Sequence, residues 1–169
     1  MAMFKILATI VLLLISLPAV AQDIPLRSQS NIMLQIYQVD RTLARAGGVN
    51  TAVVYGTDAE SAQQMEDILS SRGLSVSTVS RDDFANVASD YSVAYFTPDA
   101  DAAPDVTADN GVLSIGVNED QFDDGDLSIC FALDDNQQLL ILVNRNQLDE
   151  EGHEMESGFF DLERVVASN

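Results

Sequence analysis

Apolar and polar positions switch between helical and strand spacing along most of the chain. The helical segments expected from this spacing cover residues 32–43, 59–69 and 81–88. The strands expected from β-branched or alternating runs cover residues 51–55, 74–79, 91–96 and 112–117. Residues 98–110 carry neither pattern and are expected to be a connection. Because parallel neighbours need a crossover, the alternation of strand and helix predicts a parallel sheet.

The segment that follows predicts a β-hairpin. Two apolar runs, Leu127–Leu133 and Leu139–Val143, flank residues 134–136, which read Asp-Asp-Asn. Asp and Asn side chains hydrogen-bond their own backbone and favour turns. We expect this hairpin to add antiparallel strands at one edge of the sheet.

Helical spacing returns after the hairpin. Asn144 can cap a short helix that Gly152 ends, and apolar residues recur at helical spacing from Phe159 to Val166. The whole is predicted to be a three-layer α/β/α domain. Its sheet is mostly parallel, with a C-terminal antiparallel β-hairpin followed by helix.

The first residues resemble a secretory leader. Lys5 precedes an apolar run over residues 6–17, and Ala19-Val20-Ala21 supplies small residues for cleavage. The run stops at Pro18, short of the roughly 20 residues that a membrane-spanning helix needs. We therefore predict a signal peptide over residues 1–21, cleavage after Ala21, and one periplasmic domain over residues 22–169 without membrane insertion.

The charge balance excludes several classes of function. Eight basic residues face 27 acidic ones, and the formal net charge is −19. Such a surface repels phosphate backbones and anionic lipids, so nucleic-acid binding is not expected. Lys5 is the one lysine, so the predicted domain has no lysine for a P-loop or a Schiff base. The acidity is explained either by solubility or by adaptation to salty surroundings.

The turn after the first predicted strand lies where open α/β sheets bind ligands. Its sequence, Tyr55-Gly56-Thr57-Asp58, contains one glycine and lacks the dinucleotide-binding fingerprint. A helix N-terminus can hold a small anion, but Asp58 already supplies a negative charge there. We expect Asp58 to cap the next helix.

The acidic residues clustered over residues 119–126 suggest a calcium-binding site. Aligning Gly125 with the glycine of an EF-hand loop places Phe122 and Phe131 where oxygen ligands belong, so that motif is absent. A looser calcium site remains an open alternative, because clustered carboxylates suit hard cations.

The single cysteine and the single histidine give little support for catalysis. Cys130 falls within an alternating apolar run and is expected to be a buried free thiol. His153 follows Gly152 among acidic residues, whereas zinc sites generally use several His or Cys ligands. A Ser-His-Asp hydrolase would have to use His153, and no G-x-S-x-G motif accompanies it. No metal, cofactor or catalytic residue is predicted.

Several short motifs occur along the chain in an informative order and spacing. Asp40 to Gly47 reads D-R-T-L-A-R-A-G and includes Arg41 and Arg45. The tail has Gly125 before the hairpin, I-L-V-N ending at Asn144, Gly152, and finally Ser157 with F-F-D-L-E-R-V-V, which includes Arg164. In these motifs and their spacing the chain resembles the YfiR-like family of secreted bacterial proteins. Phe159 and Phe160 replace the usual leucines, and the cysteine pairs of some relatives are missing.

The resemblance implies a non-enzymatic regulator. Relatives bind the periplasmic sensor domain of an inner-membrane diguanylate cyclase and hold it inactive, which controls cyclic di-GMP and biofilm formation. Arg41, Arg45 and Arg164 then contact the partner or, as we prefer, form internal or local ion pairs. The missing cysteines imply that disulfide control is not inherited. The alternative is a periplasmic small-ligand-binding protein that serves a receptor or transporter.

Overall fold

The computed structural model describes residues 24–168, so the predicted signal peptide lies outside the described residues. The strands are β1 (Asn50–Tyr55), β2 (Ser75–Ser80), β3 (Val93–Phe96), β4 (Leu113–Gly116), β5 (Ile129–Leu133), β6 (Leu139–Asn144) and β7 (Val165–Ser168). The α-helices are α1 (Leu26–Val39), α2 (Arg41–Ala46), α3 (Ala59–Ser70), α4 (Arg81–Val87), α5 (Pro104–Asn110), α6 (Glu119–Asp123) and α7 (Arg145–Glu150). Short 3₁₀ turns cover Ala88–Asp90 and Ser157–Phe159. Among the described residues, no helix has the length and apolar character needed to cross a membrane.

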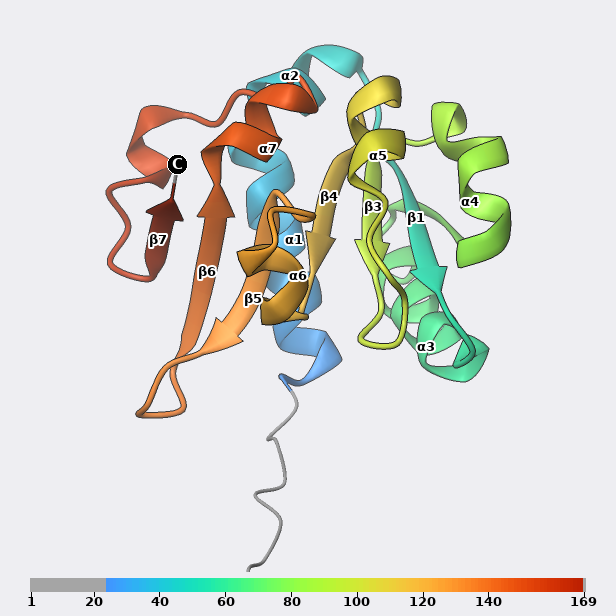
Figure 1. The fold of residues 1–169 in the computed structure, drawn as a ribbon, viewed down its shortest axis with the longest axis horizontal. Helices are drawn as coiled ribbons and strands as arrows, with labels where there is room; N and C mark the ends of the chain where they lie inside the picture. Colours follow the sequence, from blue (N-terminus) through green and yellow to red (C-terminus); the bar gives the residue numbers. More distant parts are fainter. Residues whose placement is uncertain (1–23, 169) are drawn as a thin grey trace, which may run out of the picture.

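The strands form one sheet in the order β2-β1-β3-β4-β5-β6-β7 (Figure 1). All neighbouring pairs are parallel except β5 and β6. The predicted fold class is therefore confirmed: helices flank a mostly parallel sheet that contains one antiparallel hairpin. The placement of the hairpin was wrong in two respects. β5 pairs in parallel with β4, and the connection between these strands contains α6. The edge of the sheet is formed by β7 and not by the hairpin.

Two apolar layers hold the helices to the sheet. Side chains of α1 and α3 pack with alternate strand residues such as Val53, Tyr95 and Ile115 on one face. On the opposite face, Phe84, Phe122 and their neighbours from α4 to α6 pack over the remaining strand residues. β3 and β4 are buried along their whole length, because helices cover both faces of the sheet there.

The helix predicted over residues 32–43 is broken at Asp40. Asp40 has extended dihedrals (φ −83°, ψ 111°), and its Oδ1 accepts hydrogen bonds from the Thr42 and Leu43 N–H groups at 2.7 and 3.2 Å. A carboxylate that caps a helix favours a non-helical backbone at its own position. Asp40 therefore ends α1 and begins α2, and its backbone forms an isolated bridge with Met155.

The helix predicted from Phe159 to Val166 is also wrong. Phe159 ends a 3₁₀ turn, and Val165–Ser168 forms β7 in parallel with β6. Short apolar runs do not distinguish helix from strand by spacing alone, and adjacent β-branched valines favour a strand. The free edge of β6 supplies the backbone partners that decide between the two.

The connection predicted over residues 98–110 contains a helix. Pro104 occupies the first turn of α5, where its missing N–H costs nothing, and Gly111 follows in the left-handed region at φ 63°. The turn of the hairpin agrees with prediction, because Asp134 Oδ1 accepts hydrogen bonds from the Asn136 and Gln138 N–H groups, both at 2.8 Å.

A side chain at position 56 is expected to destabilise the fold. A Cβ built on Gly56 would lie 2.2 Å from the carbonyl oxygen of Asp99, so the backbone would have to shift. We expect Gly56→Ala to lower the free energy of unfolding by about 1–3 kcal/mol, as overpacking typically does. Chemical denaturation measures this. Gly158→Ala, where a Cβ would meet nothing within 4 Å, is the control and should change stability by less than about 0.5 kcal/mol.

Candidate functional site

The junction between α1, α2 and the loop after α7 brings together most of the predicted motif residues. His153 Nδ1 lies 2.6 Å from Asp40 Oδ2, and their side chains are 1% and 0% exposed. His153 Nε2 lies 3.3 Å from the carbonyl oxygen of Gly111. Residues far apart in the sequence therefore form one buried polar contact.

The two partners of His153 both accept hydrogen bonds. An ionised carboxylate has no hydrogen to donate, and neither has a carbonyl oxygen. A neutral imidazole donates through one nitrogen only, so which of the two contacts the ring donates to depends on where its hydrogen lies. With both nitrogens engaged and the ring buried, His153 is committed to internal contacts.

A more exposed layer surrounds this pair. Arg41 Nη1 lies 2.8 Å from Glu154 Oε1, and Arg45 Nη2 lies 3.4 Å from Glu154 Oε2. Thr42 Oγ1 also donates to the carbonyl oxygen of Gly152 at 3.1 Å. Arg41 and Arg45 thus form internal ion pairs, the kind of contact that was preferred for them. Each exposed ion pair contributes about 0–1 kcal/mol to stability. Arg41 and Arg45 therefore orient the loop but stabilise the fold only weakly.

Glu151 is the centre of a second buried polar group, which sequence reasoning missed. It is 2% exposed and accepts hydrogen bonds from the Ser114 N–H at 3.0 Å, from Ser128 Oγ, and from Gln147 Nε2 at 3.2 Å. Ser114 Oγ in turn accepts a hydrogen bond from the Ser128 N–H at 2.8 Å. The group joins α7 to β4 and to the start of β5, beside the Asp40–His153 pair.

The remaining motif residues have structural contacts. Asn144 caps α7 by accepting hydrogen bonds from the Asn146 and Gln147 N–H groups at 3.1 and 3.2 Å, and a Cβ on Gly125 would lie 3.8 Å from Asn144 Nδ2. Gly152 follows α7 at φ 74°, as predicted. The Arg164 side chain is exposed, and its carbonyl accepts a hydrogen bond from the Ile141 N–H at 2.8 Å. An ion pair of Arg164 does not occur among the described residues.

The crevice at the end of β1 already holds a carboxylate. Asp99 Oδ2 accepts hydrogen bonds from the Thr57 and Asp58 N–H groups at 2.6 and 2.8 Å, and Asp99 Oδ1 accepts one from Thr97 Oγ1 at 2.7 Å. Asp58 caps α3 as predicted, accepting from the Ser61 N–H at 3.0 Å. The N–H groups that would bind an external anion here are therefore occupied by Asp99.

Asp99 should make stability depend on acid pH. The hydrogen bonds that Asp99 accepts hold its pKa well below the usual range, and the bond from Thr97 has the largest effect. A carboxyl group whose pKa is lower in the folded than in the unfolded state stabilises the fold at pH values above its unfolded pKa of about 4. This contribution is lost as the pH falls below about 4. We expect Asp99→Asn to lower stability by about 0.3–1 kcal/mol at pH 7 and by progressively less below pH 4. Denaturant unfolding from pH 2.5 to 7 measures this; a constant difference at all pH values would contradict it.

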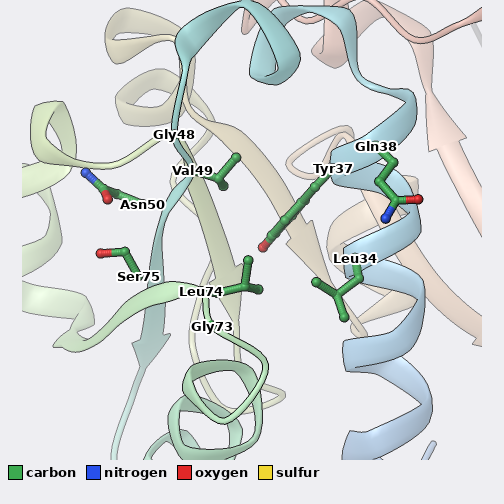
Figure 2. A pocket seen from close by; sticks show the side chains of 9 residues that line it. All are labelled: Leu34, Tyr37, Gln38, Gly48, Val49, Asn50, Gly73, Leu74 and Ser75. Carbon is green, nitrogen blue, oxygen red and sulfur yellow. The ribbon is translucent and has the colours of Figure 1, made fainter.

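Figure 2 shows an open groove between α1 and the first residues of β1 and β2. Its volume is about 420 Å³, and none of its nine lining residues is charged. Leu34, Val49 and Leu74 supply apolar walls, while Tyr37 Oη is bonded to Thr51 Oγ1 at 3.0 Å. Burial raises the pKa of Tyr37. The groove can hold a small uncharged molecule but provides no charged anchor for one.

Cys130 is a buried free thiol, as predicted. Burial, with a smaller effect of Glu119 and Asp123, raises its pKa to about 12. We expect a thiol reagent at pH 8 to modify Cys130 at least about 100-fold more slowly in the native protein than in the urea-unfolded chain. Equal rates would show that the thiol is accessible.

The acidic segment that suggested calcium forms α6, capped by Asn118. Burial, and then the charges of Asp124, Asp101 and Asp105, raise the pKa of Asp126. Within residues 24–168, no group of three or more His, Cys, Asp or Glu side chains is placed to hold a metal ion.

Comparison of the chain with models of known protein families found no matching family, and comparison with curated proteins found no similar protein.

Proposed function

We propose that this chain is a non-enzymatic periplasmic regulator that binds the periplasmic sensor domain of an inner-membrane diguanylate cyclase and represses it. The observation that carries the proposal is the Asp40–His153 junction. Its two sides belong to the two motif regions on which the YfiR-like resemblance rests, and they lie 113 residues apart. The contact brings these two regions together in the folded chain.

The environment of the reactive side chains supports binding rather than catalysis. The His153 ring is buried with both nitrogens engaged, and the Cys130 thiol is buried with a raised pKa. A general base must reach the proton that it removes, and a reactive cysteine needs an exposed, electropositive setting. Neither side chain meets its condition.

Deletion of the gene tests the proposal. We expect intracellular cyclic di-GMP and biofilm formation to rise, and we expect the full chain to restore both. A chain without residues 1–21 should not restore them, because repression requires export. Unchanged cyclic di-GMP, with the protein found in the periplasm, would contradict the proposal. An adjacent gene for a membrane protein with a GGDEF domain would identify the cyclase to test.

The groove of Figure 2 favours a second candidate, a small-ligand-binding protein that serves a receptor or transporter. A bound ligand stabilises the fold by mass action, by about 2.7 kcal/mol at 100 times its Kd. In a thermal-shift screen of uncharged envelope metabolites, a compound that binds the groove should then raise the unfolding temperature. Ser75→Phe places a ring at the groove and should abolish the shift. Absence of any stabilising compound would contradict this candidate.

A further inference from the structure

The two edges of the sheet differ in how their backbone is protected. β2 forms one edge, where the Glu66 carboxylate accepts a hydrogen bond from the Thr78 N–H at 2.8 Å. A side chain thus occupies part of that edge. β7 forms the other edge, and within residues 24–168 its one neighbouring strand is β6. An open edge is a template for a further strand.

The register of β7 shows which backbone groups face outward. Val165 pairs with Ile141, and the Ile141 N–H donates to the Arg164 carbonyl at 2.8 Å. In a parallel ladder, alternate residues bond the same neighbour, so residues 164, 166 and 168 face β6. The N–H and carbonyl groups of Ala167 therefore face the open side, ready to pair with an added strand.

Apolar side chains gather beside this edge. Val166 pairs with Leu142 in the ladder, so the two side chains share a face of the sheet, and Leu140 lies two residues away on the same face. In Figure 1, α5 and α6 lie over β3 to β5 on this face, whereas β6 and β7 carry no helix there. The large apolar side chains found exposed among the described residues are Leu162 and Val166, at 53% and 49%.

We propose that β7 is the partner-binding surface and that a basic segment of the partner adds to it as an extended strand. Main-chain bonds to Ala167 would supply affinity, and alternate apolar side chains would cover Leu142 and Val166. Basic side chains would pair with the exposed Asp161 and Glu163, which outnumber the exposed Arg164 beside them. A net charge of −19 favours a basic partner over a second copy of this chain. The partner's identity rests on the proposed function, whereas the surface itself rests on the geometry of β7.

Ala167→Pro tests the surface directly. Proline removes the outward N–H of residue 167 and leaves Val166 and Ser168 to bond β6. Ala167→Ser retains the N–H and is the matched control. Val166→Ser removes the apolar contact without altering the backbone. In the deletion strain, the wild type and Ala167→Ser should lower cyclic di-GMP, while Ala167→Pro and Val166→Ser should fail to do so.

The periplasmic amount and the unfolding midpoint of each variant are measured alongside. If Ala167→Pro does not fold, Val166→Ser decides the result. Repression equal to wild type by a folded variant would overturn the β7 surface and leave the proposed function standing. Absence of repression by the wild type would overturn the proposed function and the partner assigned to β7. A wild-type dimer that Ala167→Pro converts to a monomer in light scattering would overturn the basic partner in favour of a second copy.

Discussion

Asp40→Ala is expected to lower the free energy of unfolding by about 2–4 kcal/mol, because it leaves a buried polar group without its partner and removes a helix cap. The substitution leaves the His153 ring buried with one nitrogen facing no acceptor. It also removes the cap from the Thr42 and Leu43 N–H groups, which by itself typically costs about 1 kcal/mol. Urea unfolding at pH 7, monitored by circular dichroism, measures the sum.

Two controls separate the contributions. Asp40→Asn keeps an oxygen that can cap α2 but removes the charge, so its loss of stability should be smaller than that of Asp40→Ala. Glu154→Ala removes the exposed pairs with Arg41 and Arg45 and should cost less than about 1 kcal/mol. Equal effects of Asp40→Ala and Glu154→Ala would show that the buried pair does not fix the junction.

Glu151→Ala is expected to have an effect of similar size. It leaves three donors without their acceptor, namely the Ser114 N–H, Ser128 Oγ and Gln147 Nε2. Each buried donor left unsatisfied costs about 1–3 kcal/mol, and a small cavity adds to this cost. We expect a total loss of about 3 kcal/mol or more, measured by the same unfolding experiment.

Glu151→Gln is the matched control. It keeps the volume and one acceptor oxygen, so it should recover more than half of the stability that Glu151→Ala loses. The side chain of Asp149, two residues away, is exposed, and Asp149→Ala should change stability by less than about 0.5 kcal/mol. If Glu151→Ala is no worse than Asp149→Ala, the buried hydrogen bonds of Glu151 contribute nothing to the fold.

Local sequence signals were sufficient for most of the sheet. β-branched, alternating and continuous apolar runs placed β1 to β6. The caps at Asp58 and Asn144 were predicted because a capping side chain bonds N–H groups two or three residues away. The tail from Phe159 to Val166 was misassigned because its spacing suits a helix, whereas its conformation depends on the free edge of β6.

The candidate site was predicted only in its motif residues. Asp40 and Gly152 were identified as a pattern, but the pairing of Asp40 with His153 joins residues 113 positions apart and leaves no local signal. Asp99 binds N–H groups 41 and 42 residues away. The same holds for Glu151, because buried polar groups are satisfied by whichever partners the fold brings near. Single-sequence patterns contain no information on such contacts.

The most direct test of the proposed regulatory role is a reconstitution. The membrane diguanylate cyclase proposed as the partner is expressed in cells that otherwise make no cyclic di-GMP, with and without this chain exported to the periplasm. We predict that the exported chain lowers cyclic di-GMP toward the level of cells lacking the cyclase, and that the chain without residues 1–21 does not. Equal cyclic di-GMP with and without the exported chain would contradict repression by direct contact.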